Sequence, residues 1–335
     1  MGDLLKFTNR GIYCEQANIY IDPWKPVDYA LITHGHADHA RWGHKKHLCH
    51  PLTASIIKQR ISTDLQVQTI DFGEKINING VIFSFHPAAH IIGSAQIRVE
   101  YKGEIWVASG DYKTENDGLS GEFEIVKCHT FITESTFGLP VYQWKPQAEI
   151  MTQINEWWNI NANNNCPSII YAYSLGKAQR IIQHLDQTIG PVLTHGSVEN
   201  INELFRSQRI DIPPTERVQT DIIQKTNRAI IVAPPGAHNS NWTKKFKGVK
   251  HAAASGWMTL RGARRRRSVD KGFILSDHAD WSGLNQVITA TGADKVIATH
   301  GYTETFAKWL QSKGINAITE KTSFVGESVE EDTGS

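Results

Sequence analysis

The segment His34-Gly35-His36-Ala37-Asp38-His39 places four side chains that can bind a metal within six residues. It follows the apolar run 28–33, which predicts a strand, so we expect a tight loop at a strand end. Alternate residues of such a loop point to the same side. His34 and His36 can then face one ion while Asp38 and His39 face another. A run of surface histidines is the alternative for this segment taken alone, but the spacing favours a two-metal site.

Further candidate ligands stand where other predicted strands end. His90 follows the strand predicted over 81–85, Asp111 follows the hairpin predicted over 97–108, and His300 follows the strand predicted over 295–298. A ligand set dominated by imidazole favours zinc, manganese or iron over calcium or magnesium.

The elements that must position these residues follow an alternating pattern. Short apolar runs that predict strands lie at 168–173, 229–233, 272–275 and 295–298, and helices are predicted over 177–185 and 303–310. This alternation predicts an α/β protein. With 335 residues, of which 40% are hydrophobic, the chain can form one large or two modest domains.

The apolar runs are strand-sized, far short of the roughly 20 residues that a membrane-spanning helix needs, so we expect no contact with a membrane. The N-terminus has no signal-peptide pattern. Cys14, Cys49, Cys128 and Cys166 lie far apart without a CxxC pair, which argues against a disulfide framework and a cysteine zinc site. These features predict a cytoplasmic protein.

Positive charge is concentrated in one segment, residues 241–271, which we call the basic segment. It holds ten Lys or Arg against a single acid, Asp270, for a net charge of +9, while the whole chain carries only +1. A solvated face is the alternative, but four consecutive arginines at 264–267 with one nearby acid favour contact with a nucleic-acid backbone.

Several residues in and near this segment are candidates for substrate binding. Arg261 and Arg264 could contact phosphates, Ser255 and Gly256 could offer backbone amides or form a simple turn, and Trp257 could stack on a base or fill the core. Ser174 follows a predicted strand and Lys177 opens the next predicted helix, where backbone amides or the Lys177 side chain could bind an anion. The glycine spacing there is not that of a Walker P-loop, so ATP is not implied.

The motif at 34–39, together with Asp22, His90 and Asp111, resembles the signature of the metallo-β-lactamase fold. The stretches 133–138, 276–280 and 299–301 resemble the additional motifs of the β-CASP nucleases. Within that family, residues 254–267 followed by 276–281 most resemble the bacterial ligase-associated DNA exonucleases. The resemblance covers nearly the whole chain.

The resemblance implies an αββα sandwich with an inserted β-CASP α/β domain. The first part of the metallo-β-lactamase domain would cover 1–138, the β-CASP cap domain 139–274 and the second part 275–325, followed by a disordered tail over 326–335.

The resemblance also implies a role for each site residue. One divalent transition-metal ion, zinc or manganese, would bind to His34, His36 and His90, and a second to Asp38, His39 and His300, with Asp111 bridging both. Asp22 would orient a ligand imidazole. Glu134 would pair with His278, which would touch the scissile phosphate.

We therefore expect a metal-dependent nuclease that hydrolyses phosphodiester bonds, with a two-metal-activated water as nucleophile and His278 as general acid. The resemblance favours a DNA exonuclease in DNA repair, with a possible functional partnership with a DNA ligase. An RNA-processing nuclease of the same fold is the alternative, because DNA-acting eukaryotic members often have valine at the position of His300. A small-molecule metallo-hydrolase or a non-hydrolytic nucleic-acid-binding module are more distant alternatives.

Overall fold

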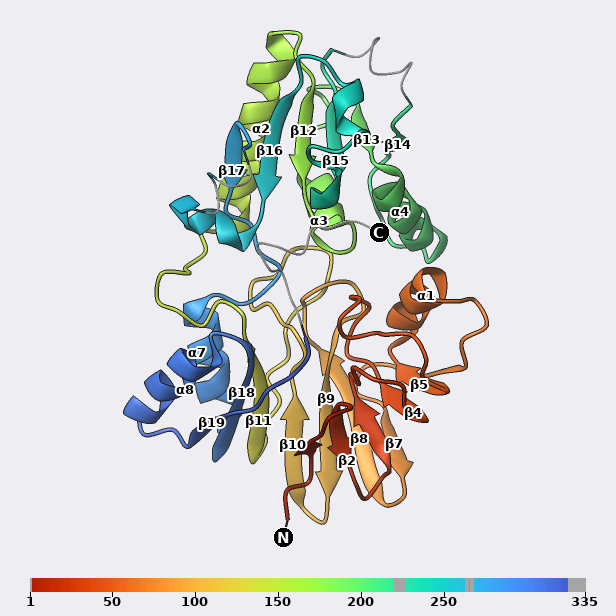
Figure 1. Cartoon of the computed structure of the whole chain (residues 1–335), viewed down its shortest axis with the longest axis vertical. Helices are drawn as coiled ribbons and strands as arrows, with labels where there is room; N and C mark the ends of the chain where they lie inside the picture. Colours follow the sequence, from red (N-terminus) through yellow and green to blue (C-terminus); the bar gives the residue numbers. More distant parts are fainter. Residues whose placement is uncertain (1, 220–226, 263–264, 266–267, 325–335) are drawn as a thin grey trace. The chain divides into compact units, whose positions relative to one another are not determined.

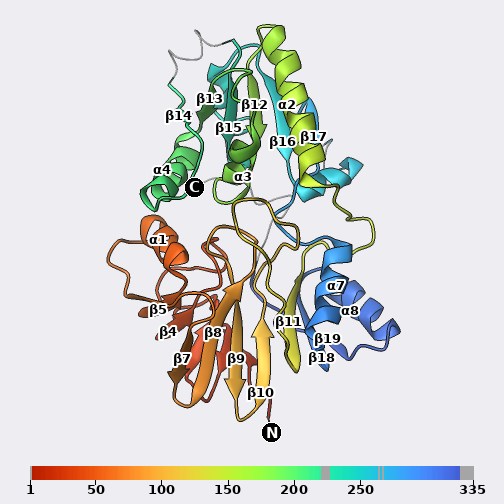
Figure 2. The same ribbon diagram turned by 180° about the vertical axis from the view of Figure 1, so that it is seen from behind.

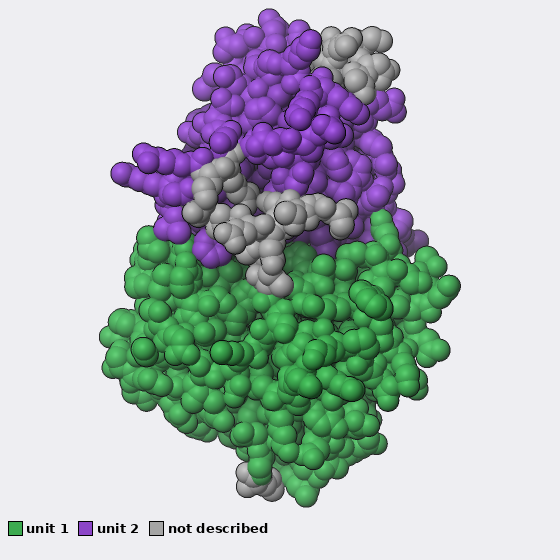
Figure 3. Space-filling model, viewed as in Figure 1, with its two compact units in different colours: residues 1–143, 278–327 green, residues 144–277, 328–335 purple. Residues whose placement is uncertain are grey.

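The computed structural model describes residues 2–219, 227–262, 265 and 268–324 (Figure 1). It is a mixed α/β structure, which confirms the predicted α/β class, while the αββα sandwich with an inserted β-CASP domain stays a prediction. The chain divides into two compact units (Figure 3). Unit 1 comprises residues 1–143 and 278–327, and unit 2 comprises residues 144–277 and 328–335. The predicted tail over 326–335 lies outside the described residues. The domain boundaries predicted from the family resemblance stay a prediction.

Unit 1 contains two sheets. The first sheet has six strands in sequence order, with β1 to β3 antiparallel and β3 to β6 parallel. Its strands are β1 (Lys6–Phe7), β2 (Ile12–Cys14), β3 (Ile19–Ile21), β4 (Tyr29–Leu31), β5 (Lys46–Cys49) and β6 (Val67–Thr69). The second sheet has the order β19-β18-β11-β10-β9-β8-β7. Its strands are β7 (Lys75–Ile78), β8 (Val81–Pro87), β9 (Ala95–Tyr101), β10 (Glu104–Ala108), β11 (Thr130–Ser135), β18 (Lys295–Gly301) and β19 (Ala317–Thr319).

The two sheets share one hydrophobic core, and a helical layer covers the opposite face of each. In β10, Trp106 and Ala108 belong to the core between the sheets, whereas Val107 packs into the core beneath the helices. This alternation follows from the two-residue period of a strand. Helices α7 (Trp281–Thr291) and α8 (Thr303–Ser312) lie beside β11 and β18 (Figure 2), and α1 (Pro51–Arg60) packs on the first sheet through Ala54 and Ile57.

Unit 2 is built on one parallel sheet of six strands, ordered β14-β13-β15-β12-β16-β17. The strands are β12 (Ser168–Tyr171), β13 (Val192–Thr194), β14 (Glu216–Arg217), β15 (Ile230–Ala233), β16 (Lys250–Ala254) and β17 (Lys271–Phe273). Among the described residues of this unit are the helices α2 (Gln147–Asn163), α3 (Lys177–His184) and α4 (Gly196–Ser207), and short 3-10 turns occur at η1 (Pro235–Ala237), η2 (Thr243–Lys245) and η3 (Gly256–Thr259).

The predicted elements are present with shifted ends. The hairpin predicted over 97–108 is confirmed as β9 and β10, which pair across Tyr101 and Glu104. The strand predicted at 168–173 and the helix predicted at 177–185 are β12 and α3. Within the described ranges, no helix is both long enough and apolar enough to cross a membrane.

Candidate metal centre

The loop 34–39 follows β4, and its two ends are held by contacts with Asp22, which comes directly after β3. The carboxylate of Asp22 accepts hydrogen bonds from the Thr33 backbone N–H (2.8 Å) and from the Thr33 hydroxyl (2.5 Å). Its Oδ2 also lies 2.7 Å from Nδ1 of His39, and all three residues are buried. This contact requires a proton on Nδ1, so Nε2 is the nitrogen of His39 that could bind a metal. Asp22 is thus in contact with an imidazole that it was predicted to orient.

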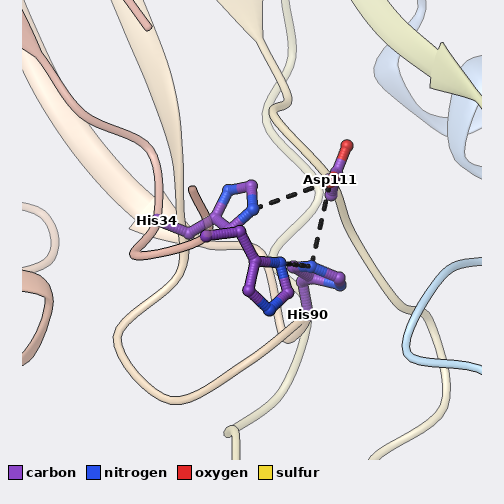
Figure 4. Close-up of side chains that lie close together, drawn as sticks. His34, His90 and Asp111 are labelled. Atoms are coloured by element: carbon purple, nitrogen blue, oxygen red, sulfur yellow. Dashed lines mark hydrogen bonds and ion pairs between the residues drawn. The ribbon is translucent and has the colours of Figure 1, made fainter. Parts of the chain in front are cut away.

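A first group of candidate ligands comprises His34, His36, His90 and Asp111, whose donor atoms lie within 4.8 Å of one another. Nε2 of His90 lies 3.1 Å from Nδ1 of His36. Oδ2 of Asp111 lies 3.6 Å from Nε2 of His34 and 3.8 Å from Nε2 of His90 (Figure 4). The structure therefore brings together the residues predicted for one ion and the predicted bridging carboxylate.

The same carboxylate faces His39, one of the three residues predicted for the second ion. Nε2 of His39 lies 3.3 Å from Oδ2 of Asp111 and 3.7 Å from Oδ2 of Asp38. His300 lies in β18 and lines a small cavity together with His39 and Asp111. Its buried Nδ1 has no hydrogen-bond partner among the described residues. His300 shares this cavity but belongs to none of the compact ligand groups found in the described part of the chain.

In this cluster, burial and the neighbouring charges shift the pKa values of the candidate ligands in opposite directions. Burial raises the pKa of Asp111, but the neighbouring His39, His278 and His34 outweigh it and hold the pKa well below its ordinary range. Burial lowers the pKa of His39, yet Asp111 and Asp38 raise the net value well above the ordinary 6.5. Burial and the surrounding imidazoles lower the pKa of His34 well below 6.5. The centre thus favours an ionised Asp111 and a neutral His34.

These residues fit a transition metal on two observations. Nε2 of His34 and Nε2 of His39 are buried and have no hydrogen-bond partner in the described residues. Leaving such atoms unsatisfied costs about 1–3 kcal/mol each unless a ligand occupies them. Both atoms face the Asp111 carboxylate, and a set of imidazole nitrogens with carboxylate oxygens is typical of sites for zinc or manganese.

Glu134 and His278 form a buried pair next to the metal-ligand cluster. Nδ1 of His278 lies 2.8 Å from Oε2 of Glu134. The carboxylate of Glu134 also accepts hydrogen bonds from the Tyr112 backbone N–H (2.8 Å) and the Thr136 hydroxyl (2.5 Å). The rings of His278 and His90 are 4.6 Å apart. The pair predicted from the family resemblance is therefore in contact, and Nε2 of His278 is the ring nitrogen turned away from Glu134.

The predicted substrate-binding residues of unit 2 differ in how accessible they are. Arg261 is exposed and Trp257 is partly exposed, whereas Ser255 and Gly256 are buried, with the Ser255 hydroxyl accepting from the Trp257 N–H (3.3 Å). The hydroxyl of Ser174, which is partly exposed, lies 2.9 Å from that of Ser197. Arg264 lies outside the described residues.

Lys177 requires a correction. It was predicted to bind an anion, but its side chain is fully buried and its ammonium lies 3.5 Å from Oδ2 of Asp277. A buried ammonium paired with a carboxylate does not offer its charge to a substrate.

Sequence reasoning missed two residues that support the ligands. Thr33 bonds to Asp22, and its hydroxyl lies 3.0 Å from Nδ1 of His34, so it connects the two. The ring of Phe324 stacks on the ring of His39 at 4.2 Å with an interplanar angle of 11°. Thr33 immediately precedes the metal motif, which could have drawn attention to it. No signal in the sequence points to Phe324.

Comparisons with known proteins support the resemblance read from the motifs. No protein-family model matches the sequence. A protein named probable DNA ligase from Opitutus terrae is 27% identical over 318 residues, which is 93% of this chain and 30% of that protein. Endoribonuclease YSH1 of Eremothecium gossypii is 27% identical over 124 residues, covering 36% of this chain and 16% of that protein. The chain thus spans less than a third of either relative.

Among solved structures, a protein of unknown function from Enterococcus faecalis V583 has a similar fold, with a TM-score of 0.61 and 9% sequence identity. The match covers 88% of this chain and 78% of the other. The chain is therefore similar in sequence to nucleases of the metallo-β-lactamase and β-CASP family, as its motifs predicted.

Proposed function

We propose that the protein is a metal-dependent nuclease that hydrolyses phosphodiester bonds. The observation that carries this proposal is the convergence on Asp111, whose Oδ2 lies within 3.8 Å of Nε2 of His34, His39 and His90. A single buried carboxylate that faces three imidazoles suits a bridging ligand between two ions. The similarity to proteins named as a DNA ligase and an endoribonuclease supports a nucleic-acid substrate.

Each ion would have its own ligands. His34, His36 and His90 would hold one, and Asp38 and His39 would hold the other, with His300 completing it from the neighbouring strand end. When bound, two zinc or manganese ions supply Lewis acidity that activates water and neutralises phosphate charge. Asp22 orients His39, and Phe324 holds the same ring from its face.

The protein's own residues would manage the leaving group. The attacking water would lose a proton to solvent as its oxygen forms a bond to phosphorus. The bond from phosphorus to the 3′-oxygen would break, and that oxygen would take a proton from Nε2 of His278, which solvent then reprotonates. The products are a 5′-phosphate and a 3′-hydroxyl. Glu134, through its contact with Nδ1, holds the imidazole in place and leaves Nε2 as the atom directed to the leaving group.

The finer assignment is a DNA exonuclease acting in DNA repair, with a metallo-β-lactamase domain over 1–138 and 275–325 and a β-CASP domain over 139–274. It is supported by the relative named as a probable DNA ligase, which matches along 93% of this chain. That similarity also supports a functional partnership with a DNA ligase. The exposed Arg261 and the rest of the basic segment would contact the substrate backbone.

An RNA-processing nuclease is the second candidate. It is favoured by His300, which stands in the cavity beside His39, and by the similarity to a protein named endoribonuclease.

A comparison of DNA and RNA as substrates distinguishes the two candidate functions. The metal-loaded protein is incubated with end-labelled single-stranded DNA and RNA of one sequence, each labelled in turn at the 5′ and 3′ end. We expect faster hydrolysis of DNA, with mononucleotides released from one end. Faster hydrolysis of RNA supports the second candidate, and no hydrolysis of either with bound metal refutes the proposal.

A further inference from the structure

Three charged side chains are buried together in unit 2, directly before His278. Lys177 and Arg180 come from α3, and Asp277 ends the segment that leads from β17 to His278. All three have at most 2% of their surface exposed. Such burial is costly for charged groups and requires close pairing.

Lys177 and Arg180 make their ion pairs and hydrogen bonds mainly with residues 276 and 277. Nζ of Lys177 lies 3.5 Å from Oδ2 of Asp277, and Nη1 of Arg180 lies 3.2 Å from Oδ1. The same Nη1 donates to the Ser276 carbonyl oxygen at 2.5 Å, and Nε of Arg180 donates to the side-chain oxygen of Gln147 on α2. Both oxygens of the Asp277 carboxylate and the preceding backbone are therefore held by α3.

The next residue is held on its other side. Asp277 ends the first segment of unit 2, and His278 begins the returning segment of unit 1. Nδ1 of His278 bonds to Glu134, which is itself fixed by Tyr112 and Thr136. One peptide bond thus joins two anchored side chains, and this restricts where the imidazole of His278 can point.

We propose that Lys177, Arg180 and Asp277 are positioning residues that set the orientation of His278 for proton transfer to the leaving oxygen. The inference rests on the proposed function. It assigns to the buried cluster a role distinct from substrate binding. It also gives a reason for keeping three buried charges, since apolar residues of similar volume are often as stable as a buried ion pair.

The test uses variants that keep the shape of the cluster. Asp277→Asn removes the charge with little change in volume, and Arg180→Lys keeps the charge but loses the forked geometry. The matched control is Arg206→Gln, which breaks the ion pair with Glu199 (2.8 Å) elsewhere in unit 2. Folding is checked by thermal unfolding and metal content by elemental analysis.

Rates are measured on two DNA substrates, one natural and one with sulfur in place of the bridging 3′-oxygen, a leaving group that needs no proton. We expect Asp277→Asn to lose about 10–100-fold in kcat on the natural substrate, as is typical for a group that supports a catalytic side chain. On the sulfur substrate it should cleave nearly as fast as the unmodified protein. Arg180→Lys should show the same pattern as Asp277→Asn. The control Arg206→Gln should keep nearly the full kcat on both substrates.

The combined variant Asp277→Asn/His278→Ala should be no slower than His278→Ala alone, because the cluster acts through His278. Three outcomes would overturn the proposal. Equal losses of rate on both substrates, or failure of both variants to fold, would show that the cluster serves only the stability of the fold. Unmodified rates in the folded variants would show that the cluster has no effect on His278. Failure of the proposed function is distinguishable, since the unmodified protein would then cleave neither substrate.

Discussion

At the scale of single residues, Asp111 decides what the centre can bind. Its Oδ2 faces His34 and His90 at 3.6 and 3.8 Å and His39 at 3.3 Å, so in the proposed function this one carboxylate would serve both ion positions. His36 belongs only to the first group. The two residues should therefore differ in how many ions depend on them.

We expect Asp111→Ala to deplete both ions, and His36→Ala to deplete mainly one, with hydrolysis abolished in both variants and the fold intact. The unmodified protein should hold about two ions per chain. Elemental analysis beside circular dichroism measures this. The control is His86→Ala, a histidine paired with Glu124 outside the centre (2.9 Å), which should keep both ions. Full activity of either ligand variant in chelator would contradict the prediction.

His44 provides a prediction about pH and stability. Both ring nitrogens are buried without a hydrogen-bond partner in the described residues, and burial, with His47 and Arg41 nearby, lowers its pKa from 6.5 to about 4. The folded protein therefore keeps His44 neutral at a pH where the unfolded chain protonates it. Its stability contribution is present above pH 6.5 and is lost as the pH falls towards 4.

His44→Leu should remove that part of the acid sensitivity. Between pH 7 and pH 5 the variant should lose about 2 kcal/mol less unfolding free energy than the unmodified protein. Urea unfolding at both pH values, at matched metal content, measures the difference. Equal losses in the two proteins would show that His44 does not titrate differently on unfolding.

At the scale of elements, the strand ends could be predicted from the sequence, because the ligands follow apolar runs. β10, β11 and β18 are parallel neighbours, so Asp111, Glu134 and His300 meet at one edge of the sheet. This edge follows from pattern and topology. By contrast, the stacking of Phe324 on His39 and the burial of Lys177 against Asp277 depend on contacts between segments far apart in sequence, which no local pattern encodes.

The packing of the loop 34–39 against α1 allows a test at this scale. A β-carbon on Gly35 would lie 2.5 Å from Cγ2 of Ile56, and Nε of Arg60 donates to the Gly35 carbonyl oxygen at 3.1 Å. The helix and the loop are therefore packed without spare room. Gly35→Ala should push the loop away from α1 and weaken metal binding by about 10–100-fold.

The matched second variant removes the obstructing group. Gly35→Ala/Ile56→Ala should regain much of the metal affinity, while Ile56→Ala alone should keep the affinity and lose about 2–5 kcal/mol of stability through the cavity. Competition with a fluorescent chelator measures affinity, and urea unfolding measures stability. A double variant as weak as Gly35→Ala would show that the loop does not depend on this packing.

At the scale of the whole molecule, the dominant feature is the charge distribution. The basic segment carries +9 in a chain whose total is +1, so the remainder is acidic by about eight charges. A polyanion should be repelled by most of the protein and attracted by this segment, in which Arg261 and Arg265 are exposed. Binding strength should therefore depend on where charge is removed as well as on how much.

The last prediction compares two variants with the same change in net charge. In one, the four arginines at 264–267 become serine. In the other, four exposed lysines of unit 1, Lys102, Lys308, Lys313 and Lys321, become serine. Both are made in the Asp111→Ala background to prevent hydrolysis, and binding to an oligothymidine of fixed length is measured over a range of salt concentrations.

The arginine variant should bind more weakly and show a flatter plot of log affinity against log salt. The slope should change by up to about 0.7 for each phosphate that the variant no longer neutralises, because fewer counterions are released. The weakening should be similar for all DNA sequences, since phosphate contacts carry no base information. The lysine variant should keep the original slope. An unchanged slope in the arginine variant would place the substrate elsewhere, and equal flattening in both variants would show that net charge, rather than the basic segment, governs binding.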